Sequence, residues 1–385
     1  MATIALGVLA VIVLVTAVVV ATHGHHGRPA TNGPGATNSI PGTPTIPGTP
    51  TTPGTPTIPG PGGGGPGPVS SGVKPPLQGL IDRQGEPPTA MRPAVSAWVV
   101  NVRWADLQPT NDSTALVTPN AIDQALDQVR SLNQAAPTQP LRLKIRLFAG
   151  VDAPDWVKQL GGGPVPIHDP VDQVDGTTGR FWTDDFGRAY GRLQQLLAAR
   201  YDTVPEIAEI TISRCSTVYA EPFIRQSADT QTSQALVAAG DTPDADERCL
   251  MEQIDAHQVW THTLSGLALN PYQKPGAGLD EAFTESMMAY CRKVLGPRCV
   301  LENNSIRWPT PRGVMGQMYQ AIRRFGPPIS FQTAAPGRVG DLAKTLEWAT
   351  AEGANAVELP RSADTFPATQ LRAAADRLRQ NRVAP

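Results

Sequence analysis

The chain has 385 residues, with 36 Gly, 39 Pro and four Cys. Its 32 Lys and Arg residues nearly balance 34 Asp and Glu residues, and only two of these charges, both basic, precede residue 77. This balance excludes the basic face that binds nucleic acid, and four Cys are too few for a disulfide-dense miniprotein.

An uncharged hydrophobic run covers residues 4–21 and consists mostly of Val, Ala, Leu and Ile. Its 18 residues approach the length of a membrane span and exceed most signal-peptide cores. Residues 19–21 (Val-Val-Ala) would also suit a signal peptidase, so an uncleaved anchor and a cleaved signal both stay open. Residues 1–28 therefore predict export, and we expect the protein outside the cell, membrane-anchored or secreted.

Residues 29–76 form a low-complexity segment in which the sequence IPGTPT occurs at 40–45 and again at 46–51. Pro at every third position prevents helix formation and removes backbone donors, so the pattern is typical of an extended, disordered spacer. A linker of this kind holds a folded domain away from a membrane or wall.

From residue 77 to residue 385, short β-branched runs alternate with amphipathic stretches. The predicted strands cover 77–81, 97–104, 141–149, 207–213, 263–269, 299–305, 329–333 and 356–359. Helical patterns cover 119–133, 184–200, 244–260, 280–295, 313–325, 339–351 and 368–380, and the first connection shows none. Eight strands alternating with helices predict an α/β fold, a (β/α)₈ TIM barrel. A doubly wound sheet is the alternative, although no Gly-rich fingerprint follows a strand.

The four cysteines fit an exported domain. Cys291 and Cys299 flank the turn between a predicted helix and a predicted strand, which favours a local disulfide. Cys215 and Cys249 would form the second pair; the other two connectivities and free buried thiols stay open. There is no Cys-x-x-Cys motif, so we expect no metal site, and no cofactor is implied.

Active groups of a (β/α)₈ barrel lie at the carboxyl ends of its strands. This rule selects the candidates Trp104, Gln108, Trp156, Glu221, Glu302, Asn304, Gln332 and Glu358. Trp104 and Trp156 would either stack on sugar rings or fill the core. Asn304 would either bind a hydroxyl group or form a turn.

Arg146 lies within the third predicted strand, and Lys144 shares its face because side chains alternate along a strand. Two buried cations are costly unless acids pair with them. The pattern therefore predicts a polar barrel interior; the alternative is that both face the edge of the helix layer.

Three short motifs occur in a fixed order against the strands: W-x-x-L-Q-P at 104–109, G-x-x-A-P-x-W at 150–156 and A-E-P at 220–222. Together they resemble the (β/α)₈ glycoside hydrolase clan, most nearly its β-galactosidase-like, family 42-like members. The resemblance spans residues 97–360. It implies that Glu221 is the general acid/base, whereas Ala220 replaces the Asn that precedes this Glu in the clan.

The resemblance also places the nucleophile, a Glu, at the end of the seventh strand, where this chain has Gln332. An amide cannot attack an anomeric carbon. Either residues 356–359 are the seventh strand and Glu358 is the nucleophile, or the chain has lost hydrolysis and kept a sugar-binding cleft.

The leading hypothesis is a monomeric glycoside hydrolase-like protein that acts on an extracellular or cell-envelope saccharide through Glu221 and Glu358. Its substrate-binding candidates are Trp104, Gln108, Arg146, Trp156, Glu302, Asn304 and Gln332. A non-catalytic carbohydrate-binding protein on the same barrel is the alternative. A structural surface protein is the third, and a hydrophobic patch without a cleft would favour it.

Overall fold

A computed structural model describes residues 72–111, 114–170 and 173–381. The hydrophobic run and nearly all of the predicted linker lie outside the described residues. Within the described part of the chain, no helix is both long and hydrophobic enough to cross a membrane.

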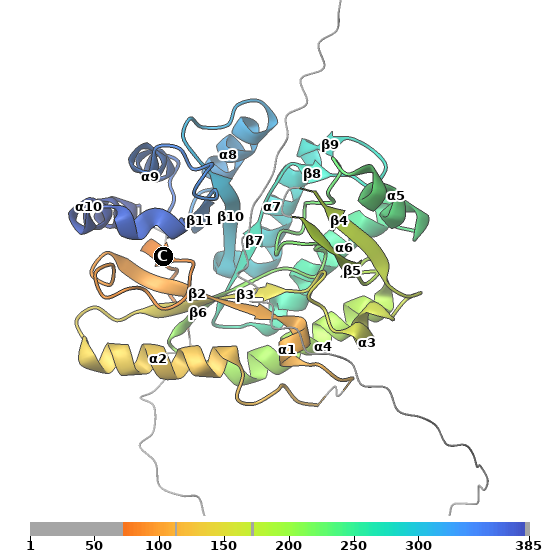
Figure 1. Ribbon diagram of the computed structural model, residues 1–385, viewed down its shortest axis with the longest axis horizontal. Coiled ribbons are helices and arrows are strands. Elements are labelled where there is room, and N and C mark those ends of the chain that lie inside the picture. The colour runs from red at the N-terminus through yellow and green to blue at the C-terminus, as the bar shows by residue number, and fades with distance from the viewer. Residues whose placement is uncertain (1–71, 112–113, 171–172, 382–385) are drawn as a thin grey trace, which may run out of the picture. The chain divides into compact units, whose positions relative to one another are not determined.

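Eight parallel strands close into a barrel (Figure 1). In chain order they are β1 (Gly79–Asp82), β2 (Val95–Arg103), β3 (Arg142–Phe148), β6 (Ile207–Thr211), β7 (Leu264–Ala268), β10 (Cys299–Ile306), β11 (Ile329–Thr333) and β12 (Ala356–Leu359). Their order around the barrel follows the chain, and β1 closes it by pairing with β12. This confirms the predicted TIM barrel, and each strand overlaps one predicted run.

Helices connect the strands on the outside of the barrel. They are α1 (Trp104–Leu107), α2 (Ala121–Ala135), α3 (Asp155–Lys158), α4 (Asp184–Tyr201), α5 (Thr230–Ala238), α6 (Pro243–Ala256), α7 (Glu281–Leu295), α8 (Val314–Phe325), α9 (Leu342–Ala351) and α10 (Ala368–Arg379). The seven predicted helices are confirmed as α2, α4 and α6–α10. The sequence prediction omits α1, α3 and α5 because they are too short for a hydrophobic period to show.

Two small antiparallel hairpins extend the loops above the barrel and were not predicted. They pair β4 (Val165–Asp169) with β5 (Val174–Thr178), and β8 (Tyr272–Gln273) with β9 (Leu279–Asp280). Both lie in connections that follow barrel strands, where insertions leave the barrel itself unchanged.

The hydrophobic core has two parts because alternate residues of each strand face opposite ways. The larger part joins the outer strand faces to the helices. The smaller part consists of Leu77, Ile81, Ala97, Val99, Ala208 and Ala356, which fill the barrel near the amino ends of its strands. The polar side chains of the barrel interior lie between this smaller part of the core and the carboxyl ends of the strands.

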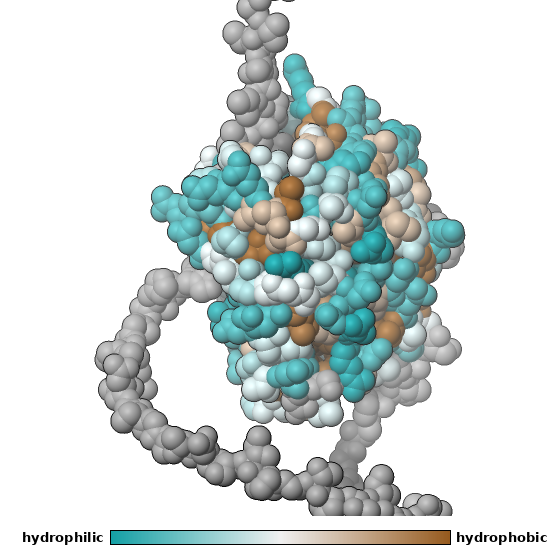
Figure 2. Space-filling view, turned by 90° about the vertical axis from the view of Figure 1, so that its right-hand side faces the viewer, coloured by the Kyte–Doolittle hydropathy of each residue, from teal (hydrophilic) through white to brown (hydrophobic). Residues whose placement is uncertain are grey.

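Both expected disulfides are present. Cys215 bonds to Cys249 across 34 residues, and Cys291 bonds to Cys299 across eight. The face of the molecule in Figure 2 carries small hydrophobic areas separated by hydrophilic residues. This face therefore lacks the broad hydrophobic patch that the structural-protein hypothesis requires.

Candidate functional site

The two cations of β3 point into the barrel, as predicted. Lys144 and Arg146 are both buried, and acids from three other strands surround them. Nζ of Lys144 lies 2.8 Å from Glu209, 2.5 Å from Glu302 and 3.0 Å from Glu358. Burial lowers the pKa of Lys144, but the three carboxylates together raise it above its ordinary value, so the ammonium stays charged.

Glu302 forms the deep part of this cluster. It hydrogen-bonds Glu209, and burial together with that neighbouring carboxylate raises the pKa of Glu302 despite the opposing charge of Lys144. A buried carboxyl group beside a second carboxylate ionises less readily, so these contacts favour the neutral form of Glu302. Gly266 on β7 leaves the space that Glu302 occupies, since a Cβ there would lie 2.6 Å from the carboxyl group. These contacts make Glu302 part of the barrel interior.

Glu358 on β12 is the ionised acid of the cluster. Arg146 Nη2 lies 2.5 Å from Glu358 Oε2, and Lys144 contacts Oε1. Burial would raise the pKa of Glu358, but the charges of Arg146 and Lys144 outweigh burial and lower the pKa to about 2. Glu358 therefore carries a negative charge throughout the neutral range.

Glu221 is buried in the loop that follows β6. Asn270 Nδ2 donates a hydrogen bond of 2.9 Å to Glu221 Oε1, whereas Oε2 has no partner within the described residues. Burial raises the pKa of Glu221 to about 7; the Asn270 hydrogen bond and the charge of Arg146 oppose the rise, and the charge of Glu358 adds to it. The group is poised to give or take a proton near neutral pH.

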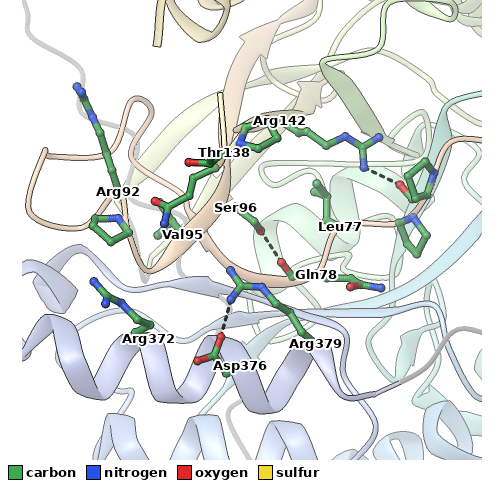
Figure 3. A pocket seen from close by; sticks show the side chains of 15 residues that line it. Leu77, Gln78, Arg92, Val95, Ser96, Thr138, Arg142, Arg372, Asp376 and Arg379 are labelled. Atoms are coloured by element: carbon green, nitrogen blue, oxygen red, sulfur yellow. Dashed lines mark hydrogen bonds and ion pairs between the residues drawn. The ribbon is translucent and has the colours of Figure 1, made fainter. Parts of the chain in front are cut away.

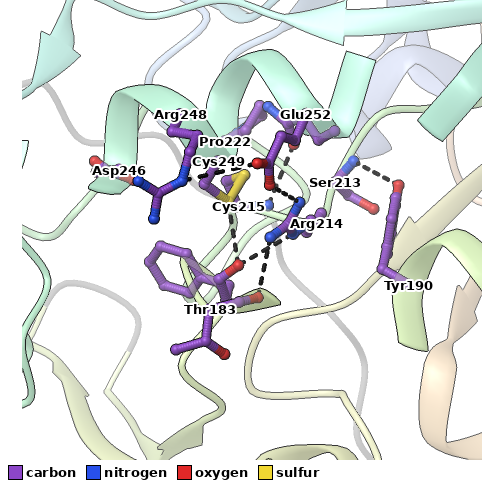
Figure 4. Close-up of a disulfide and its surroundings, with 12 residues drawn as sticks. Thr183, Tyr190, Ser213, Arg214, Cys215, Pro222, Asp246, Arg248, Cys249 and Glu252 are labelled. Atoms are coloured by element: carbon purple, nitrogen blue, oxygen red, sulfur yellow. Dashed lines mark hydrogen bonds and ion pairs between the residues drawn. A yellow bond between two sulfur atoms is a disulfide. The ribbon is translucent and has the colours of Figure 1, made fainter. Parts of the chain in front are cut away.

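One face of helix α6 holds both ends of the loop that carries Glu221. Figure 4 shows the first of these contacts, the disulfide. At the start of the loop, Cys215 forms its disulfide with Cys249. At the end of the loop, Arg225 Nη2 lies 2.5 Å from Asp246 Oδ1, and both side chains are buried. Asp246 and Cys249 are three residues apart and therefore neighbours on the helix surface. The position of Glu221 is thus set by α6.

A second support for this loop comes from the connection after β3. Val151 N donates a hydrogen bond of 2.8 Å to Thr217 O. A Cβ at Gly150 would lie 1.7 Å from the same oxygen, a distance no side chain can accommodate. Gly150 is therefore required for the close approach of two backbones beside Glu221.

Gln332 lies on β11, the seventh barrel strand, and Glu358 lies on the eighth. The alternative in which residues 356–359 form the seventh strand is therefore wrong. The two residues are register partners. Gln332 Nε2 donates to the backbone oxygen of Asn304 at 3.2 Å, and Gln332 Oε1 is buried without a partner among the described residues. An amide oxygen left free in this way can accept a hydrogen bond from a ligand.

Asn304 is buried within β10, so the interpretation that it forms a turn is wrong. Three other candidates form a separate group. Trp104 is fully buried and packs edge-to-face against Phe186 and Tyr190 of α4 and against Trp156. Its indole nitrogen donates to Gln108 Oε1 at 3.2 Å, and Trp156 Nε1 donates to Gln108 O at 3.0 Å. Trp104 therefore fills the core, and Gln108 joins the two indoles.

Three residues of the candidate site were not predicted from the sequence. Asn270 follows β7, the fifth barrel strand, and a lone Asn after a strand is no more typical of a site than of a turn. Arg83 follows β1, and its Nη1 donates to Thr333 O at 2.7 Å close to Glu358. Glu209 lies inside a short hydrophobic strand, where a lone acid already indicates a buried partner.

Among the described residues, no group of three or more His, Cys, Asp or Glu side chains could hold a metal ion. The clustered carboxylates contact Lys144 and Arg146 instead. The arrangement is suited to proton transfer and to binding hydroxyl groups.

Comparison with known protein families and with curated proteins gave no match. Similar solved structures include endo-glycoceramidase II from Rhodococcus sp., which is 14% identical over 77% of this chain and 75% of that chain, with a TM-score of 0.42. A β-galactosidase from the psychrophilic Marinomonas ef1 is 12% identical over 77% and 59%, with a TM-score of 0.37. Morphinone reductase is 17% identical over 79% and 87%, with a TM-score of 0.40. Because a TIM barrel hosts many unrelated reactions, similarity of fold assigns no reaction to this chain.

Proposed function

We propose that this chain is an exported glycoside hydrolase-like protein that acts on an extracellular or cell-envelope saccharide through Glu221 and Glu358. The observation that carries the proposal is the environment of Glu221. It is a buried acid with one free carboxyl oxygen, and it lies within the electrostatic reach of the Arg146–Glu358 ion pair. Glycoside hydrolysis requires two carboxyl groups in such contrasting environments.

The roles follow from the protonation states. Glu221, with its pKa near 7, would protonate the leaving oxygen. Glu358, held ionised, would act as the base or the nucleophile. Both of its oxygens are in ion pairs, which reduces their nucleophilicity. The same ion pairs lower its basicity, so they favour neither role over the other.

Other parts of the proposed site would bind the sugar. The free acceptors Gln332 Oε1 and Asn270 Oδ1 are buried and could receive hydroxyl protons. Arg146 Nε is also unpartnered within the described residues and could donate to a ring or hydroxyl oxygen. The family 42-like assignment rests on the three sequence motifs, and the disulfides, hydrophobic run and linker support export.

A non-catalytic carbohydrate-binding protein is the second candidate function. The observation in its favour is Gln332, an amide on the seventh strand where the resembling hydrolases carry their nucleophile. If this reading holds, the parent binds a saccharide without turnover, and Gln332→Glu creates measurable hydrolysis of activated substrates.

The test uses the full chain, prepared in neutral detergent under oxidising conditions, with a panel of aryl glycosides and oligosaccharides. Glu221→Gln should abolish turnover of substrates with poor leaving groups and spare those with good ones, because only poor leaving groups need a proton. Glu285→Gln, an exposed acid on α7, is the matched control. Saccharide binding without turnover in every variant except Gln332→Glu would reject the hydrolase in favour of the binding protein.

A further inference from the structure

A cavity of about 580 Å³ lies at the amino ends of barrel strands, whereas Glu221 follows the carboxyl end of β6. Figure 3 shows the residues that line this cavity. Its wall includes the residues that enter β1, β2 and β3, together with the exposed side of helix α10. Pro75 and Pro76, the last residues of the predicted linker, also line it. Catalytic groups of a (β/α)₈ barrel lie at the other end, so a ligand bound here would occupy a separate site.

Four arginines from three separate segments line this cavity. Arg92 precedes β2, Arg142 begins β3, and Arg372 and Arg379 extend from α10. Asp376 is the one acid among the described residues that line it. The concentration of positive charge is local, because the chain as a whole has a net charge of −2. A concave site lined by guanidinium groups attracts oxyanions.

Two of these charges lack a carboxylate partner. Arg372 is exposed and forms no hydrogen bond or ion pair in the described part of the chain. Arg142 donates Nη1 to Pro75 O at 2.7 Å, and its Nη2 is buried without a partner among the described residues. The exposed Arg372 guanidinium therefore contributes uncompensated positive charge to the cavity, and Arg142 adds a charge that is held by a backbone oxygen.

The other two arginines hold only exposed ion pairs. Arg92 lies 2.7 Å from Glu86, and Arg379 lies 2.7 Å from Asp376. All four of these side chains are at least one third exposed. Exposed pairs contribute about 0–1 kcal/mol, so a ligand anion can replace these partners at little cost.

The neutral part of the lining indicates what else the ligand carries. Gln78, Ser96, Thr138 and Gln139 supply amide and hydroxyl groups beside the arginines. The volume lies within the range of about 300–1,000 Å³ that is typical of small-molecule sites, and it exceeds what a single inorganic anion would fill. We propose that this cavity binds a polyhydroxylated molecule that bears a phosphate or carboxylate group, such as an acidic sugar.

The proposal does not depend on the proposed hydrolase function. Binding is measured by isothermal titration calorimetry on the full chain in neutral detergent, with glucose 6-phosphate and glucuronic acid as separate probes. Glucose tests the need for the anion, and inorganic phosphate tests the need for the hydroxyl groups. We expect one or both acidic sugars to bind, and the stronger of the two identifies the anionic group. Added salt should weaken binding, since exposed charges are screened.

Three variants locate the site. Arg372→Gln should weaken binding about tenfold, equivalent to 1.4 kcal/mol. Asp376→Asn should tighten it about threefold, because it removes the competing carboxylate from Arg379. Arg188→Gln is the matched control, since Arg188 is an exposed, ion-paired arginine on α4. Because Arg372 and Asp376 are exposed, both substitutions should leave the fold intact.

The outcomes separate clearly. Binding that Glu221→Gln leaves unchanged, and that shifts in opposite directions in Arg372→Gln and Asp376→Asn, supports the site whatever the result of the hydrolase tests. The proposal is overturned if glucose or inorganic phosphate binds as tightly as the acidic sugars. It is also overturned if neither α10 variant changes the affinity, or if neither acidic sugar binds at millimolar concentration.

Discussion

Arg146 and Glu358 meet across the interior of the barrel, with Arg146 Nη2 2.5 Å from Glu358 Oε2. Their strands, β3 and β12, are separated by β2 and β1 in the order of the sheet. The pair therefore exists only once the barrel is closed. It keeps Glu358 ionised, and its charges also act on the pKa of Glu221.

The first prediction concerns the pH dependence of the proposed acid. A general acid works only while it is protonated, so kcat/KM should fall as pH rises through about 7, the pKa of Glu221. Asn270→Ala removes a hydrogen bond that lowers this pKa and should move the fall to higher pH. The same shift should appear in the NMR titration of the Glu221 carboxyl carbon, which needs no turnover. If the pKa of Glu221 is the same in Asn270→Ala as in the parent, the hydrogen bond from Asn270 does not act on Glu221.

The second prediction concerns stability at different pH values. The folded-state pKa of Glu221 is raised above its ordinary value of 4.5, so the folded chain holds a proton that the unfolded chain has lost, and stability falls as pH rises from about 4.5 to about 7. Glu221→Gln removes this loss and should be more stable than the parent at pH 8 by about 3 kcal/mol. Urea unfolding at pH 5 and pH 8 measures the difference. Glu285→Gln should show no comparable gain.

The third prediction concerns the buried cation. Lys144→Met leaves three carboxylates around an uncharged side chain and should lower the free energy of unfolding by about 3–5 kcal/mol. Adding Glu302→Gln should restore part of this loss, because it removes one of the unpaired acids. Lys293→Met, an exposed site on α7, should change stability by less than about 0.5 kcal/mol. A similar loss at both lysines in urea unfolding would show that the cluster is not the cause.

The fourth prediction separates the two disulfides. Replacing Cys215 and Cys249 with Ala opens a 34-residue loop and frees one end of the segment that carries Glu221. The cost should be about 2–4 kcal/mol, with a loss of saccharide turnover or binding. Replacing Cys291 and Cys299 opens a loop of only eight residues and should cost less and spare the site. The reverse ranking would remove α6 as the support of Glu221.

The fifth prediction uses two glycines. Gly150→Ala places a methyl group against Thr217 O and should displace the loop that holds Glu221, with lower stability and loss of turnover or saccharide binding. Gly191 lies inside helix α4 with nothing within 4 Å of an added Cβ. Gly191→Ala should therefore raise stability by about 0.5–1 kcal/mol and leave the site unchanged. Thermal unfolding and the saccharide assay on both variants provide the comparison.

The sequence alone determined the barrel, because strand and helix periods are local and survive in any context that buries one face. It also favoured the disulfide pairing that the structure confirms, and it placed Glu221, Gln332 and Glu358 at the ends of strands. The inward direction of Arg146 followed from the two-residue period of β3 together with the cost of an unpaired buried charge.

Only the tertiary structure decided the partners of these groups. Lys144 binds acids from β6, β10 and β12 because barrel closure brings strands that are distant in sequence around one interior. Trp104 entered the core because α4 supplies Phe186 and Tyr190 beside it. Residue type and spacing cannot give the environment of a charge or a ring, since burial and neighbouring charges depend on how all the elements pack.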